Sequence, residues 1–107
     1  MPSKKRAAIV GAGLSGLTAA HRLRQYGWEV TIFEADDHAG GRVQSVARDG
    51  YIIDTGASAI AESYKAYIEL ADELGLGNEI VAAPSCVGIF RDGRLHELNL
   101  ERMLSVA

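Results

Sequence analysis

The chain has 107 residues, of which 48% are hydrophobic and 23% are charged, and this is the size and composition of one soluble globular domain. Its formal net charge of -3 argues against a nucleic-acid partner, because phosphate backbones are bound by basic surfaces. The single cysteine, Cys86, excludes an internal disulfide and has no second thiol at metal-site spacing. We therefore expect no metal site and a cytoplasmic location.

The N-terminus imitates a secretory signal peptide. Three basic residues, at positions 4–6, precede a mostly apolar stretch over residues 7–20, which is the order found in such peptides. Glycines at positions 11, 13 and 16 interrupt that stretch, and further patterned elements follow it without a break. No apolar run reaches the ~18 residues that a membrane-spanning helix needs. The pattern therefore favours a folded domain without a transmembrane segment.

The first half of the chain predicts one βαβ unit. Residues 6–10 contain a short apolar run that suits a central parallel strand buried on both faces. Apolar residues recur at helical spacing from Leu14, which predicts a helix to about Tyr26, and Gly27 is placed to end it. Residues 29–34 are rich in β-branched and aromatic types and are predicted to form the second strand.

The second half predicts two hairpins and a helix. Residues 42–47 and 51–54 are expected to pair across the turn at residues 48–50. A helix is predicted over residues 64–74, with Tyr64 and Tyr67 on its apolar, core-facing stripe. Residues 86–90 and 95–98 flank an Asp-Gly turn and are predicted to form a second hairpin, and residues 101–107 resemble the opening of a helix.

The motif Gly-x-Gly-x-x-Gly lies between the first predicted strand and the first predicted helix. Gly11 permits the tight turn, Gly13 lets the backbone approach a pyrophosphate, and Gly16 allows close packing of helix on strand. The helix N-terminus adds unpaired N–H groups and a partial positive charge, which suit a diphosphate. The context therefore predicts dinucleotide binding.

Two further features narrow the ligand. Glu34 ends the second predicted strand 23 residues after Gly11, close to the spacing of the acid that binds ribose hydroxyls, and its charge disfavours a 2′-phosphate. Gly40 and Gly41 then allow a bare backbone near the ligand, with the guanidinium of Arg42 placed against phosphate. Glu34 also permits NAD, but the Gly-Gly-Arg segment has no task in an NAD-dependent dehydrogenase.

Residues 9–58 resemble the flavin-containing amine oxidase superfamily, which includes monoamine oxidases, protoporphyrinogen oxidases and phytoene desaturases. The resemblance lies in IVGAGLSGLTAAHRLRQYGWEVTIFEADDHAGGRV and YIIDTGAS. It implies an FAD cofactor, with both glycine segments embracing the diphosphate and the acid binding the adenosine ribose. The implied cofactor-binding residues are Gly11, Ala12, Gly13, Leu14, Ser15, Gly16, Glu34, Ala35, Gly40, Gly41, Arg42, Gly56, Ala57 and Ser58.

The resemblance also implies an activity. Members of the family remove a hydride from a C–N or C–C bond of a small organic substrate, an amine or a CH–CH donor, with the flavin as acceptor. They are several times longer than this chain, and the family's later substrate domain has no counterpart here, so no catalytic residue is assigned. Some relatives attach to membranes peripherally, which leaves that association open here.

We expect an α/β fold that forms the N-terminal part of a larger FAD- or NAD(P)-binding domain. A doubly wound sheet needs several parallel strands, and only one βαβ unit is evident, so an apolar face or sheet edge should be exposed. Residues 1–58 would be the dinucleotide-binding part and residues 59–107 the start of the substrate region. The alternatives are a compact small domain with an unusual sheet, an NAD-binding dehydrogenase, and a truncated nucleotide-binding module without activity.

Overall fold

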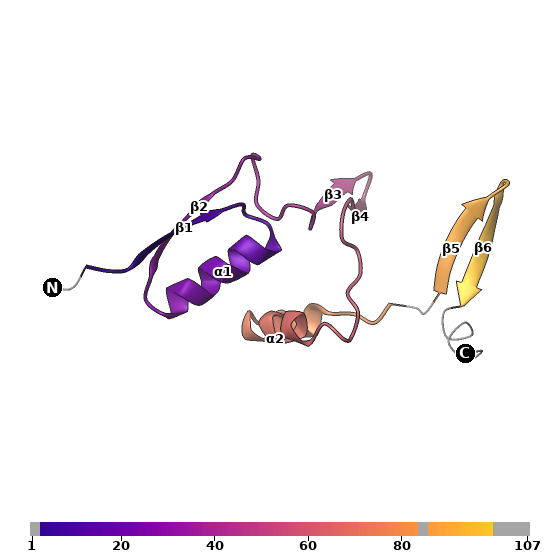
Figure 1. Cartoon of the computed structure of the whole chain (residues 1–107). Helices are drawn as coiled ribbons and strands as arrows, with labels where there is room; N and C mark the ends of the chain where they lie inside the picture. The colour runs from indigo at the N-terminus through magenta and orange to yellow at the C-terminus, as the bar shows by residue number, and fades with distance from the viewer. Residues whose placement is uncertain (1–2, 84–85, 100–107) are drawn as a thin grey trace. The chain divides into compact units, whose positions relative to one another are not determined.

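The structure is a computed structural model that describes residues 3–83 and 86–99 (Figure 1). These residues fall into two units, divided between Ile60 and Ala61. The helix predicted for residues 101–107 lies outside the described residues. Within them, every helix is too short or too polar to cross a lipid bilayer.

The first unit opens with the predicted βαβ arrangement. Strand β1 spans Arg6–Val10, helix α1 spans Leu14–Gln25 and strand β2 spans Glu29–Phe33. The two strands are parallel, with a register that runs from Arg6 opposite Glu29 to Val10 opposite Phe33. Helix α1 contacts both strands. The prediction of a βαβ unit is confirmed, and the carboxyl ends of both strands therefore lie on the same side of this small sheet.

The return from α1 to β2 depends on Gly27. Its φ of +79° lies in the left-handed region, where glycine is favoured at the end of a helix. The Trp28 N–H donates to the Leu23 carbonyl at 3.0 Å, and the Gly27 N–H donates to the Arg24 carbonyl at 2.9 Å. This pair of bonds is a Schellman motif. It ends α1 at the predicted place and turns the chain directly into β2.

The burial of β1 differs from the prediction. The expected burial on both faces is wrong, because alternate residues of β1 and β2 are exposed and the Val10 side chain is 90% exposed. Within this unit the only described residues that are buried are Ala12 and Ala20, and each keeps a small exposed fraction. A two-stranded sheet with one helix leaves its other face and edges uncovered. The expectation that an apolar face would be exposed is confirmed.

A hairpin completes the first unit. Strands β3 (Ser45–Arg48) and β4 (Tyr51–Asp54) pair antiparallel. The predicted strand start at residue 42 is wrong, because β3 begins at Ser45. The predicted three-residue turn is also wrong, because Arg48 is still in the strand and pairs with Tyr51. Asp49 and Gly50 alone form the turn, with φ values of +51° and +82°. Such turns match the twist of paired strands better than longer ones.

The second unit contains helix α2 (Lys65–Glu73), the short 3-10 helix η1 (Gly77–Glu79), and the antiparallel strands β5 (Cys86–Arg91) and β6 (Arg94–Asn99). The predicted helix and hairpin are confirmed. The expectation that Tyr64 is a core residue is wrong, because its side chain is 60% exposed. Tyr64 is the residue before the first turn of α2, outside the apolar stripe, and Ala71 is the residue that α2 buries.

Candidate cofactor-binding site

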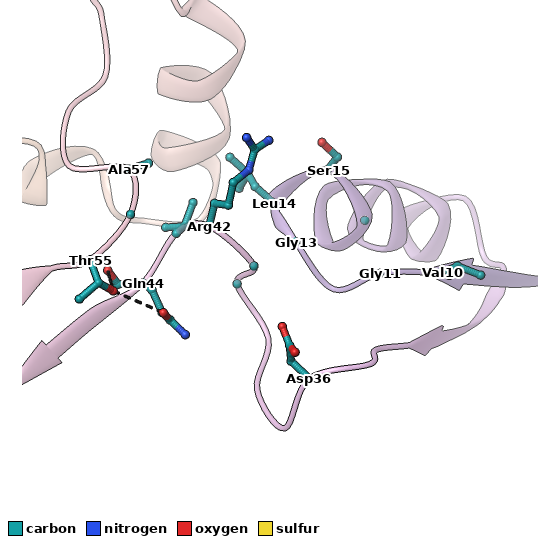
Figure 2. Close-up of a pocket in the computed structure, with 15 residues that line it drawn as sticks. Val10, Gly11, Gly13, Leu14, Ser15, Asp36, Arg42, Gln44, Thr55 and Ala57 are labelled. Atoms are coloured by element: carbon teal, nitrogen blue, oxygen red, sulfur yellow. Dashed lines mark hydrogen bonds between the residues drawn. The ribbon is translucent and has the colours of Figure 1, made fainter.

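The first unit contains a cleft of about 1140 Å³ beside the carboxyl end of β1 (Figure 2). Three segments of the chain form its walls: the turn between β1 and α1 with the first turn of α1, the loop between β2 and β3, and the residues after β4. The lining residues are Val10, Gly11, Gly13, Leu14, Ser15, Gly16, Asp36, Gly40, Gly41, Arg42, Val43, Gln44, Thr55, Gly56 and Ala57.

Backbone hydrogen bonds join the first two segments. The Gly11 N–H donates to the carbonyl of Phe33 at 2.7 Å, and the Gly40 N–H donates to the carbonyl of Ala12 at 2.8 Å. Gly13 and Gly40 also form an isolated parallel bridge. The two glycine-containing segments therefore lie against each other as adjacent backbones, although Gly13 and Gly40 are 27 positions apart along the chain.

The third segment is held by the second. The Ala57 N–H donates to the Arg42 carbonyl and the Thr55 N–H donates to the Gln44 carbonyl, both at 2.9 Å. A Cβ atom on Gly56 would overlap the Arg42 carbonyl oxygen. Glycine at position 56 is therefore what allows the Asp-Thr-Gly stretch to lie against the Gly-Gly-Arg loop.

Two glycines of the first motif have different surroundings. A Cβ atom on Gly16 would overlap the Gly11 carbonyl oxygen and would lie 3.4 Å from Cγ2 of Ile9, so this glycine lets α1 approach β1. A Cβ atom on Gly13 would meet no protein atom within 4 Å. The absent side chain at Gly13 therefore leaves open space in the cleft, which fits the backbone approach of a ligand.

The wall of the cleft near α1 is electropositive. The Leu17 N–H donates to the Gly13 carbonyl at 3.0 Å, so the three preceding amides of α1 have no partner within the helix. Its first turn contains no acidic residue. Figure 2 shows the Arg42 side chain extending toward this turn, beside Leu14. Free amides, a helix dipole and a guanidinium together suit a diphosphate.

Glu34 has a structural task. Its Oε2 accepts a hydrogen bond from the Ala12 N–H at 2.5 Å, and its Oε1 accepts one from the Asp36 N–H at 3.0 Å. These two hydrogen bonds, of which the one from the Asp36 amide has the larger effect, hold the pKa of the Glu34 carboxyl below its ordinary value of 4.5. The carboxylate therefore fastens the end of β2 to the glycine turn, and Glu34 does not line the cleft.

His38 orders the loop between Glu34 and the Gly-Gly-Arg segment. Its Nδ1 lies 2.7 Å from the Asp37 carboxylate, and its Nε2 contacts the Gln44 side-chain amide. The hydrogen bond that the His38 ring donates to the Asp37 carboxylate raises the pKa of His38. The Thr55 hydroxyl in turn donates to Oε1 of Gln44 at 3.3 Å, as Figure 2 shows. The described residues bring together no group of three metal-ligating side chains.

The cleft collects most of the residues that the sequence indicates. Ten line it: Gly11, Gly13, Leu14, Ser15, Gly16, Gly40, Gly41, Arg42, Gly56 and Ala57. The other four, Ala12, Glu34, Ala35 and Ser58, lie outside its lining. Sequence reasoning missed Val10, Asp36, Val43, Gln44 and Thr55. All five are within two residues of an indicated position, so the signal for them is adjacency to the motifs.

An α/β unit with a glycine turn at a helix N-terminus and a second glycine loop beside it defines a dinucleotide-binding protein. The family described as flavin containing amine oxidoreductase matches residues 14–105. The chain therefore belongs to the flavin containing amine oxidoreductases, and its cofactor is FAD. The resemblance seen in the sequence is confirmed.

Individual relatives agree with this assignment. Mitochondrial protoporphyrinogen oxidase of Nicotiana tabacum is 50% identical over 74 residues, which are 69% of this chain and 15% of that protein. A crystal structure of an Exiguobacterium sp. 255-15 protein assigned to the protoporphyrinogen oxidases matches with a TM-score of 0.73 and 32% identity, over 89% of this chain and 22% of that one. A structure of putrescine oxidase bound to putrescine matches with a TM-score of 0.62 and 43% identity, over 67% and 16%. The chain thus spans about 15% of the length of this protoporphyrinogen oxidase and of a second one from Arabidopsis thaliana.

Proposed function

We propose that this chain holds the adenosine diphosphate part of FAD for a flavin-dependent oxidoreductase. The observation that carries the proposal is the convergence of three backbone segments on one cleft with an electropositive wall. The free amides at the start of α1 and the Arg42 guanidinium would bind the diphosphate, and Gly13 leaves the space for it. When bound, the flavin accepts a hydride from the substrate.

The residues of this chain bind and orient rather than react. None of the groups that line the cleft combines a nucleophile with a neighbouring base, and six of the fifteen lining residues are glycine. The task of the chain is therefore to fix the position of the cofactor. We propose that residues 1–58 are the dinucleotide-binding part of a larger FAD domain and that residues 59–107 begin the region that meets the substrate.

The exposed apolar surface supports a longer polypeptide. Val10 at the end of β1 is 90% exposed, and Phe33 at the end of β2 is 58% exposed. In a doubly wound fold further parallel strands and helices cover these positions. The relatives, of which this chain spans about 15%, are long enough to supply them. Catalysis then belongs to the whole polypeptide.

Two comparisons support a proposal for the substrate class. The tobacco relative that shares 50% identity and the structural relative with a TM-score of 0.73 are both described as protoporphyrinogen oxidases. We infer that the complete enzyme removes hydrides from a porphyrinogen-type substrate at C–C or C–N bonds. Amine oxidation is the second candidate, because a structure of putrescine oxidase bound to putrescine matches 67% of this chain at 43% identity.

Calorimetric titration of the purified chain with FAD, ADP, NAD and FMN tests the cofactor assignment. We expect weak binding of FAD and ADP, weaker binding of FMN, which lacks the adenosine diphosphate, and no oxidation of protoporphyrinogen or putrescine. FMN that binds as tightly as ADP, or NAD that binds while FAD does not, would contradict the proposal. A chain that retains stoichiometric flavin and turns over substrate unaided would contradict the division of labour.

A further inference from the structure

A series of side-chain contacts crosses the loops that form the cleft. It begins at the carboxylate of Asp37, which lies 2.7 Å from Nδ1 of His38. Nε2 of His38 contacts the side-chain amide nitrogen of Gln44, and Oε1 of Gln44 accepts a hydrogen bond from the Thr55 hydroxyl at 3.3 Å. Gln44 and Thr55 line the cleft, and Figure 2 shows their side chains joined by this bond. A histidine outside the cleft lining is therefore connected to a hydroxyl within it.

These contacts require a neutral histidine. An amide nitrogen only donates hydrogen bonds, so Nε2 of His38 accepts from Gln44 and carries no proton. The ring proton is then on Nδ1, where the Asp37 carboxylate accepts it. The single proton of the Thr55 hydroxyl is directed to Oε1 of Gln44 or to the Gln44 backbone carbonyl, which lies 3.4 Å from the hydroxyl oxygen. In this state the protein itself engages the only donor of Thr55.

Protonation of His38 reverses the direction of these hydrogen bonds. Both nitrogens of an imidazolium are donors, so Nε2 would face the amide nitrogen of Gln44 as one donor against another. A half-turn of the Gln44 amide removes this conflict, because it places Oε1 toward His38 and the amide nitrogen toward Thr55. The Thr55 oxygen then accepts from Gln44, and its own proton is released from Oε1. The hydroxyl can then donate to an acceptor in the cleft.

The charges around His38 bring this change close to neutral pH. The charged groups that act on its ring are all acidic, namely Asp37, Asp36 and Glu34, and its partner on the other side of the ring is an uncharged amide. The hydrogen bond to Asp37 has the largest effect, and it raises the pKa of His38 above the ordinary value of 6.5. The pKa values of Glu34 and Asp37 are lowered, so these two acids stay ionised while His38 titrates.

We propose that the Thr55 hydroxyl is a cofactor-binding group and that His38, acting through Gln44, sets whether its proton is available to the cofactor. This inference rests on the proposed function and adds to it one binding residue and two positioning residues. FAD offers acceptor oxygens on its diphosphate and on its flavin, and Thr55 donates to one of them when its proton is not engaged by Gln44. The cleft therefore holds FAD more tightly when His38 is protonated.

NMR of the ligand-free chain tests the connection between the three residues. The ring signals of His38, the side-chain amide signals of Gln44 and the backbone amide signal of Thr55 are followed from about pH 5.5 to about pH 8. We expect all three to shift with one midpoint, and His38→Gln to abolish the shifts at the other two residues. His96→Gln removes a histidine of β6 and should leave them unchanged. Gln44 signals that do not follow the His38 midpoint would overturn the inference.

The affinity for FAD at the two ends of this pH range tests the contact with the cofactor. We expect the wild-type chain to bind FAD about threefold more tightly at the lower pH, as one neutral hydrogen bond allows. Thr55→Val, which removes the hydroxyl, should lose this pH dependence. Gln44→Met should lose it too, although it keeps the charge of His38. If the dependence persists in Gln44→Met, the imidazolium acts through its own electric field and the inference is wrong.

Adenosine diphosphate ribose locates the acceptor, because it contains the diphosphate of FAD without the flavin. An equal pH dependence for both ligands would assign the acceptor to the diphosphate, and a dependence confined to FAD would assign it to the flavin; either result supports the inference. A wild-type chain that binds FAD equally well at both pH values would overturn the inference alone. A chain that binds FAD at neither pH would overturn the proposed function.

Discussion

The two units of this chain use glycine in different ways. In the first unit, Cβ atoms on Gly16 and Gly56 would overlap backbone carbonyl oxygens of other segments. In the second unit, Gly75 and Gly93 have open space around them, a Cβ atom on Gly88 would meet only the end of the Leu95 side chain, at 3.0 Å, and one on Gly77 would overlap the carboxylate of the Asp72 side chain. Both units therefore use glycine in local turns, and the first unit also contains glycines at which backbone segments approach each other closely. Alanine should therefore be tolerated poorly at Gly16 and Gly56, where it meets backbone, and better at Gly88, where it meets the end of a side chain.

The largest effect is expected for Gly16→Ala. Replacement of a glycine inside a helix by alanine ordinarily stabilises by about 0.5–1 kcal/mol. Here the new Cβ would overlap the Gly11 carbonyl, so we expect the first unit to lose about 2 kcal/mol or more together with its ADP binding. Urea denaturation followed by the amide signals of each unit measures this.

Gly88→Ala is the control for that substitution. It places the same methyl group in β5, where only a flexible leucine terminus must move. The free energy of unfolding should change by less than about 1 kcal/mol, and ADP affinity should not change. If Gly16→Ala and Gly88→Ala are equally mild, the contrast between the two units is wrong.

The next effect concerns charge in the cleft. Arg42→Ala should lower ADP affinity roughly tenfold to a hundredfold, the range of charge-assisted hydrogen bonds, and should leave adenosine affinity unchanged. Arg48→Ala is the matched control, because Arg48 lies in the same unit but its guanidinium pairs with Asp49 at 3.7 Å on the β3–β4 turn. An Arg42→Ala variant that weakens ADP and adenosine equally would show that Arg42 does not contact phosphate.

The smallest effect is a pH dependence at Glu34. The Asp36 and Ala12 amides hold the pKa of Glu34 below its ordinary value of 4.5. A carboxyl with a depressed folded-state pKa stabilises the fold above its unfolded pKa, and that contribution is lost as pH falls through the folded pKa. The wild-type Tm should therefore drop more steeply below about pH 4.5 than the Tm of Glu34→Gln.

Glu62→Gln serves as the comparison for that measurement, since it removes an acid from the second unit. Its Tm profile should keep the steep wild-type decline. Identical profiles for the wild type and Glu34→Gln would mean that the two backbone hydrogen bonds to Glu34 do not stabilise the folded chain.

Most elements of the fold could be predicted because their signals are local. Gly27 ends α1 and Asp92-Gly93 turns the β5–β6 hairpin through the backbone conformations that these residues favour. Burial was not predictable in the same way, since an apolar run such as that ending at Val10 indicates a strand and does not say what covers it. The wrong prediction for Tyr64 has a local cause. The predicted helix began at Tyr64, whereas α2 begins at Lys65, so Tyr64 precedes the helix and is not part of its apolar stripe.

In the candidate site, too, features with a local sequence signal could be predicted and features that depend on distant contacts could not. The glycine motif and the Gly-Gly-Arg segment identified eight lining residues and the stretch over residues 54–58 identified two more, because all three carry their function in backbone shape. The role of Glu34 is still a prediction from its spacing, and the structure places its oxygens on the Ala12 and Asp36 amides. Spacing locates an acid near the ligand but cannot say which backbone amides its oxygens also accept from, because that depends on contacts between distant segments.

The central claim is that three backbone segments of the first unit together hold adenosine diphosphate. Backbone amide shifts recorded during titration of the chain with ADP test it most directly. We expect progressive shifts at Gly13, Gly41 and Gly56, one in each segment, with a common dissociation constant, and no shifts in the β5–β6 hairpin. Shifts confined to one segment, or as large in the hairpin as in the cleft, would contradict the account.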